Sequence, residues 1–130
     1  MPGTSGNAGL FSTALDLSVY CRMVMGHGLW KGKRVLSREA VEVLTAVQTH
    51  GHAYGFDVAS SYAWIKGMHV SEQAFCHSGY TGVSVVCGPA VQIYLIILTN
   101  RVHLYDAGTC KLLRREIAEI VLAPPVHDVG

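Results

Sequence analysis

Apolar residues recur at the spacing of an α-helix in three segments of the chain. The first segment is predicted to begin after Thr13, which pairs with Asp16 in a pattern similar to a capping box. Gly26 and Gly28 are predicted to end this helix. Its buried face is expected to hold four residues at helical spacing: Leu17, Tyr20, Cys21 and Val24.

The second helical segment is predicted to begin at Ser37, after a turn over residues 30–34. Leu36 and Val41 flank the capping residue at the positions of a hydrophobic staple. A turn at residues 50–52 is predicted to end the helix. Its inner face is expected to hold Ala40, Val43, Leu44 and Val47.

The third helical segment is predicted to begin near Thr109 and to end at Pro124. Its apolar face is expected to hold Leu113, Ile117, Ile120 and Val121. The charged residues are expected to lie mostly outward: Lys111, Arg114, Arg115, Glu116 and Glu119.

Between the second and third helical segments the pattern changes to that of β-strands. Residues 54–58 predict a strand, and residues 62–66 predict its return strand. Residues 83–87 alternate, whereas residues 91–98 are almost continuously apolar, which is typical of a strand covered on both faces. Because a short turn at residues 88–89 joins these two strands, they must be antiparallel. The order of elements predicts an α+β fold, with an antiparallel sheet flanked by helices.

The composition is poor in charge. Charged residues make up 15% of the 130-residue chain, whereas soluble domains average about 25%. This apolar surplus predicts that one face is covered, by a partner subunit or by a missing half of the same fold. Ten Lys and Arg against nine Asp and Glu give no electrostatic case for nucleic acid or an anionic membrane surface. The apolar run at residues 91–98 is too short to span a membrane, and residues 1–6 do not resemble a signal peptide.

The cysteines and histidines offer a metal site only as an alternative. The four cysteines are widely spaced without a C-x-x-C pair, and they are interpreted as small buried hydrophobic residues: Cys21, Cys76, Cys87 and Cys110. His50 and His52 form a His-x-His pair that could supply two metal ligands, and His69, His77, His103 and the cysteines are also available. No second cluster has ligand spacing, so neither a metal nor another cofactor is expected.

A nucleophilic hydrolase needs a Ser or Cys beside a base. No Ser or Thr of this chain has Lys three positions later, and Gly-x-Ser-x-Gly and Tyr-x-Asn are also absent. Ser5-Gly6-Asn7 matches Ser-x-Asn, but it lies in a Gly-rich segment and is interpreted as a turn. The sequence therefore offers no catalytic nucleophile.

Polar and glycine residues at positions 77–82 interrupt the predicted sheet. A glycine within a strand lets a ligand or another backbone come close, and His77 and Ser78 present an imidazole and a hydroxyl there. A backbone N–H just after Gly79 is placed to donate to a substrate carbonyl oxygen. The alternative is a Gly-rich β-bulge with a capped histidine.

His77-Ser78-Gly79 resembles the Lys/His-Thr/Ser-Gly element of serine β-lactamases, penicillin-binding proteins and related esterases. Further segments resemble that family in the same order: GNAGLFSTALDL at residues 6–17, GKRVLS at residues 32–37, and LTNRVH at residues 98–103. The final helix with Arg114 and Arg115 also fits. Each motif is loose alone, but four motifs in the family's order are specific.

The resemblance implies that residues 1–130 are the C-terminal portion of a single β-lactamase/transpeptidase-like domain, incomplete without the N-terminal half that carries Ser-x-x-Lys and Tyr-x-Asn. It implies that His77, Ser78 and Gly79 wall the active site and that the N–H of Tyr80 lends itself to the oxyanion hole. His77 stands where many members carry Lys, which weakens the case for a β-lactam substrate. Family members are often exported.

The implied reaction is acyl transfer on a small-molecule ester or amide, by a serine that a lysine activates and without a metal. This chain alone is expected to be inactive, because its catalytic Ser and Lys are missing. We also expect it to bind the missing half or to self-associate through exposed apolar surface. The alternative is a non-catalytic binding module or pseudoenzyme that holds a carboxylate or peptide.

Overall fold

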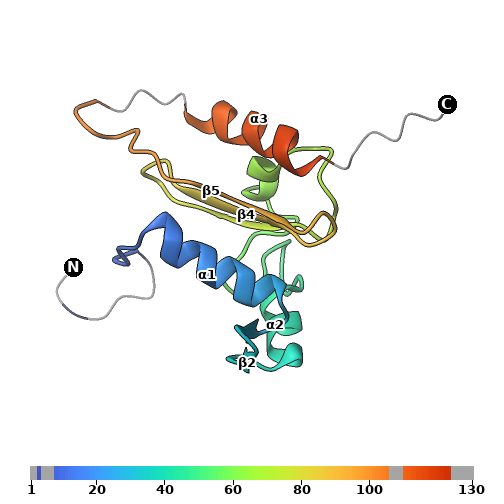
Figure 1. Ribbon diagram of the computed structural model, residues 1–130. Helices are drawn as coiled ribbons and strands as arrows, with labels where there is room; N and C mark the ends of the chain where they lie inside the picture. The colour runs from blue at the N-terminus through green and yellow to red at the C-terminus, as the bar shows by residue number, and fades with distance from the viewer. Residues whose placement is uncertain (1–2, 4–7, 106–109, 124–130) are drawn as a thin grey trace.

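The computed structural model describes residue 3, residues 8–105 and residues 110–123, and it shows helices on both faces of a central antiparallel sheet (Figure 1). The helices are α1 (Ala14–Met25), α2 (Arg38–Thr45), the 3-10 helix η1 (Ala63–Lys66) and α3 (Cys110–Leu122). The strands are β1 (Leu29–Trp30), β2 (Lys33–Arg34), β3 (Phe75–Ser78), β4 (Ser84–Gly88) and β5 (Ile93–Ile97). This arrangement confirms the predicted mixed α+β class.

The central sheet has the strand order β3-β4-β5, and both pairs are antiparallel. The register places His77 opposite Val85 and Ser78 opposite Ser84. The sheet therefore confirms the predicted antiparallel strand pair, although the turn lies at residues 89–92 and not at 88–89, because Gly88 still pairs with Ile93. It also presents the predicted site motif at the end of β3. On β5, Leu95 packs toward one face and Ile96 toward the other, as the apolar run predicts.

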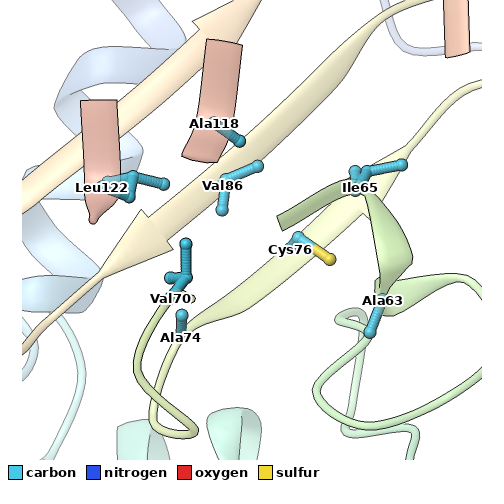
Figure 2. Close-up of a cluster of buried hydrophobic side chains, with 8 residues drawn as sticks. All are labelled: Ala63, Ile65, Val70, Ala74, Cys76, Val86, Ala118 and Leu122. Carbon is cyan, nitrogen blue, oxygen red and sulfur yellow. The ribbon is translucent and has the colours of Figure 1, made fainter. Parts of the chain in front are cut away.

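Two apolar clusters hold the layers together. The first joins the sheet to α3 and η1, and Figure 2 shows its buried side chains: Ala63, Ile65, Val70, Ala74, Cys76, Val86, Ala118 and Leu122. The second joins the opposite face to α1 and α2: Cys21, Met23, Val24, Val41, Phe56, Phe75 and Cys87. Residues that alternate along each strand thus pack into one cluster or the other, so both faces of the sheet are covered by helices.

The start of α1 is capped as predicted. The Asp16 N–H donates to the Thr13 hydroxyl oxygen at 3.1 Å. The Asp16 carboxylate accepts from the Thr13 hydroxyl at 3.0 Å instead of reaching the backbone of the cap. Cys21 and Val24 are buried as expected, but Tyr20 is exposed and Met23 is buried in its place.

The predicted cap of α2 is confirmed, but of its predicted inner face only Leu44 packs against the core, and its predicted end at residues 50–52 is too late. Ser37 accepts from the Ala40 N–H at 3.0 Å, and the helix ends at Thr45. Val41 is buried, whereas Val43 and Val47 are half-exposed. Apolar residues lie on both sides of this short helix, so periodicity alone does not select the side that meets Phe56 in the second cluster.

The predicted face of α3 is also wrong. The buried residues are Arg114, Ala118 and Leu122, which form one row at a spacing of four. Ile120 is 81% exposed, and Leu113 is half-exposed. Arg114 was expected outward because of its charge, but its guanidinium donates from Nη1 to the Val83 carbonyl at 2.9 Å beneath the helix. The predicted helix boundaries at Thr109 and Pro124 lie outside the described residues.

Two local predictions before β3 are corrected. Residues 54–58 form only isolated bridges, in which Asp57 pairs with His52 and with Cys76. Residues 62–66 are not a return strand, because η1 occupies residues 63–66 and its Lys66 ammonium donates to the Ala74 carbonyl at 2.8 Å. The predicted turn at residues 30–34 lies in the β1–β2 hairpin, where residues 31–32 form the tip and Trp30 pairs with Lys33.

Candidate functional site

A pocket of about 350 Å³ lies beside the C-terminal end of β3. Its walls come from three parts of the chain: residues 52–57, the residue directly before η1, and the end of β3. The lining residues are His52, Ala53, Gly55, Phe56, Asp57, Tyr62, His77 and Ser78. Two of the predicted site residues, His77 and Ser78, line this pocket. Gly79 and Tyr80 follow directly in the chain but are not among its lining residues.

The position of His77 and Ser78 follows from β3. Phe75 and Cys76 anchor the strand in the two apolar clusters, one on each face of the sheet. The chain leaves the core after Cys76, so His77 is exposed and Ser78 is half-buried. Both residues lie at the last two positions of β3, and both line the pocket at this end of the strand.

The glycine-rich loop after β3 is held by hydrogen bonds. The Gly79 N–H donates to the Val83 carbonyl at 2.8 Å, and the Arg101 N–H donates to the Thr81 carbonyl at 2.8 Å. Arg101 Nε also donates to the Tyr80 carbonyl at 2.6 Å, and its guanidinium carbon lies 4.4 Å from the centroid of the Tyr80 ring. The conformation of the loop is therefore tied to the segment after β5. The oxyanion role of the Tyr80 N–H stays a prediction.

The structure adds a buried carboxylate that the sequence reasoning missed. Asp57 is 8% exposed, and its Oδ1 lies 2.7 Å from His52 Nδ1. The same oxygen accepts from the Ser60 hydroxyl at 2.8 Å. The backbone of Asp57 pairs with that of Cys76, with N–O distances of 2.7 and 2.9 Å. A single acidic residue in the otherwise apolar and glycine segment at residues 53–58 was the signal available in the sequence.

The His52 imidazole is oriented by this carboxylate. Its side chain is 43% exposed, and its ring centroid lies 6.2 Å from that of Tyr62. A histidine held at one nitrogen by a buried carboxylate presents its other nitrogen in a fixed direction. The pocket therefore combines one oriented imidazole with the imidazole of His77 and the hydroxyl of Ser78.

The hydroxyl groups of the described residues are not arranged as a serine nucleophile. In the part of the chain that the structure describes, no Ser side chain is hydrogen-bonded to a Lys or His side chain, and the buried Ser60 donates to Asp57 instead. The Thr49 hydroxyl lies 2.8 Å from His50 Nδ1, but both residues are exposed and outside the pocket. Ser5-Gly6-Asn7 lies outside the described residues.

The alternative metal site does not assemble within the described ranges. No group of three or more His, Cys, Asp and Glu residues there is placed to hold a metal ion. His50 contacts Thr49, while His52 contacts Asp57. The four cysteines are free, and three of them are buried. None of the described helices is long and apolar enough to cross a membrane.

Comparison with known proteins gives one family and several partial relatives. The family model described as Beta-lactamase matches residues 1–119. An N-acetylmuramyl-L-alanine amidase of Bacillus subtilis (strain 168) is 29% identical over 107 residues, which is 79% of this chain and 24% of that protein. A putative D-alanyl-D-alanine carboxypeptidase of Escherichia coli (strain K12) is 27% identical over 107 residues, again 79% of this chain and 25% of that protein. The chain thus spans about a quarter of the length of the curated relatives it matches.

Proposed function

The chain belongs to the Beta-lactamase family, and from this premise we propose that it forms the C-terminal wall of a serine-hydrolase site that acts by acyl transfer on an ester or amide. The catalytic serine and lysine come from a segment outside these 130 residues in this proposal. Without that serine and lysine, the chain alone binds substrate but forms no acyl-enzyme. The relatives' names, an amidase and a D-alanyl-D-alanine carboxypeptidase, favour a peptide-like amide as the substrate.

The observation that carries this proposal is that a substrate-sized pocket is present while no serine of the described residues is activated by a base. His77 and Ser78 line a pocket of about 350 Å³, within the range of small-molecule sites. Among the described residues, no Ser hydroxyl is hydrogen-bonded to a basic side chain. A pocket whose described lining lacks an activated serine supports a division of roles. This chain binds the substrate, and another segment supplies the nucleophile.

Each site residue has a separate role in the proposal. The Ser78 hydroxyl donates to a substrate carboxylate or carbonyl, and His77 adds an imidazole beside it. Tyr80 contributes its backbone N–H to the developing oxyanion, where fixed donors stabilise charge most strongly. The hydrogen bonds from Arg101 and Gly79 keep the loop in one conformation while substrate binds.

The proposal is tested by binding of N-acetyl-D-alanyl-D-alanine to the full chain, followed by ¹H–¹⁵N NMR. We expect chemical-shift changes centred on His77 and Ser78. Ser78→Ala should weaken binding about fivefold, because it removes one hydrogen bond worth about 1 kcal/mol. Ser18→Ala is the matched control, since Ser18 lies on α1 and bonds only within that helix. Shifts that avoid β3, or equal losses in both variants, would contradict the proposal.

A further inference from the structure

We propose that His52, oriented by Asp57, is a proton-accepting residue of the same pocket. In this inference, which rests on the proposed acyl-transfer function, Nε2 of His52 accepts a proton from water that attacks a substrate carbonyl. The family resemblance drawn from the sequence does not include His52 or Asp57. The inference is carried instead by the geometry of their side chains.

The hydrogen bond to Asp57 defines which nitrogen of His52 carries the proton. A carboxylate only accepts hydrogen bonds, so the nitrogen at 2.7 Å from Asp57 Oδ1 must donate. That nitrogen is Nδ1. In the neutral ring the lone pair is then on Nε2, which is the form that accepts a proton.

Both members of the pair are fixed by further contacts. The Asp57 carboxylate also accepts from Ser60, and its backbone is bridged to Cys76 in β3. The backbone N–H of His52 donates to the Thr49 carbonyl at 2.8 Å, and its carbonyl accepts from Gln48 at 2.8 Å. A base whose orientation is set in this way by a third group has the geometry of a general base.

The imidazole of His52 is also accessible from the pocket. Its side chain is 43% exposed, whereas that of Asp57 is 12% exposed. Both residues line the pocket together with His77 and Ser78, and the imidazole is the more exposed of the two side chains. A carbonyl group held at Ser78 would meet water in the same pocket.

The proton and electron pairs balance without a further reactant. The water oxygen attacks the carbonyl carbon while Nε2 accepts one water proton. The tetrahedral intermediate then expels the oxygen of the acylated serine, or the p-nitrophenolate of the test ester, and the imidazolium returns its proton to that oxygen or to solvent. Asp57 stabilises the imidazolium and keeps its own charge.

The neighbouring His50 gives a matched control. It lies in the same turn, but its Nδ1 contacts the Thr49 hydroxyl at 2.8 Å, and it does not line the pocket. Its φ is 48°, in the left-handed region that Asn tolerates better than most residues. His50→Asn should therefore preserve the turn.

The test is hydrolysis of p-nitrophenyl acetate by the full chain, because this activated ester needs no serine nucleophile. His52→Asn keeps a donor near the position of Nδ1 but removes Nε2. We expect His52→Asn and Asp57→Asn each to lower the chain's second-order rate constant roughly tenfold, below the range for a fully assembled site because the ester is not held in place. His50→Asn should retain the rate. The rate that depends on His52 should also fall in deuterium oxide, since a proton moves in the rate-limiting attack.

Several outcomes would overturn the inference. His52→Asn could be as fast as the unchanged chain, or His50→Asn could lose as much. A His52-dependent rate that is equal in deuterium oxide would show that the ring attacks as a nucleophile. If a variant does not fold, ¹⁵N NMR of the unchanged chain decides: a neutral ring with its proton on Nε2 contradicts the inference. A serine of this chain labelled by a fluorophosphonate would contradict the proposed function, which places the nucleophile elsewhere. It would leave the rate difference between His52→Asn and His50→Asn unchanged, so failure of the proposed function and failure of the His52 inference are distinguishable.

Discussion

The side chain of Arg114 departs most from its sequence-based prediction, because it was expected to point outward and is buried. It is 4% exposed beneath α3, and its Nη1 donates to the Val83 carbonyl. Its Nε has no hydrogen-bond partner in the described part of the chain. The long aliphatic stem fills space between helix and sheet, which charge alone does not reveal. The burial of Arg114 depends on the sheet beneath it, so helical periodicity could not predict it.

We predict that Arg114→Met leaves the free energy of unfolding within about 1 kcal/mol of the original value or raises it. Met keeps the apolar stem, and the Val83 carbonyl retains the Gly79 N–H as a donor at 2.8 Å. Arg114→Ala should instead lose about 2 kcal/mol, because it opens a cavity. Urea unfolding measures both changes. A loss for Met as large as that for Ala would show that the guanidinium itself stabilises the fold.

Cys76 predicts a dependence of stability on alkaline pH. Burial raises the pKa of this thiol from an ordinary value of 9.0 to about 12. Between these values the unfolded chain loses the thiol proton while the folded chain keeps it, so stability falls as pH rises. The slope due to Cys76 should be about 1.4 kcal/mol per pH unit between pH 9 and 12.

The measurement compares urea unfolding of the chain and of Cys76→Ala at several pH values from 8 upward. The variant will be less stable at every pH, because a buried side chain is shortened. Its dependence on alkaline pH should nevertheless be weaker than that of the original chain. Parallel curves would contradict the assignment of the slope to Cys76.

The elements were predictable where their signals are local. Thr13 and Ser37 cap their helices as expected, and the turn after β4 sets an antiparallel pair. The faces of α2 and α3 were not predictable, because apolar residues lie on both sides of each helix. The pairing of Asp57 with Cys76 was also hidden, since it joins residues 19 positions apart. The sequence pointed to His77 and Ser78, which line the pocket, but the oriented His52 depends on that long-range bridge.

The loop that follows β3 should tolerate no side chain at Gly82. Its φ is 113°, and an added Cβ would lie 2.6 Å from the Thr99 hydroxyl oxygen. That hydroxyl donates to the Gly82 carbonyl at 2.7 Å. We predict that Gly82→Ala costs about 1–3 kcal/mol of stability through backbone strain and shifts the NMR signals of residues 78–81. Gly32→Ala is the control for strain alone, because its φ is 76° but no atom lies within 4 Å of the added Cβ. Equal effects of both variants would exclude the Thr99 contact as a cause.

At the scale of the whole molecule, apolar side chains remain on the outside of α3. Ile120 is 81% exposed and Leu112 is 66% exposed. These residues agree with the apolar surplus of the composition. We predict that the chain self-associates, and that Leu112→Lys combined with Ile120→Lys shifts sedimentation toward the monomer without lowering the melting temperature.

Glu116→Lys is the matched control for that experiment. It also lies exposed on α3, and it changes the net charge by the same amount as the double variant. Electrostatic repulsion alone would make the control and the double variant behave alike. A monodisperse monomer before any substitution would contradict the prediction directly.

The central claim is that this chain holds a substrate wall but no activated serine. Intact-mass analysis after incubation with a fluorophosphonate tests it most directly, because the reagent labels serines that a base activates. The account predicts an unchanged mass under conditions that label an active serine hydrolase completely. A stoichiometric adduct would contradict the account, and the labelled serine would identify a nucleophile within these 130 residues.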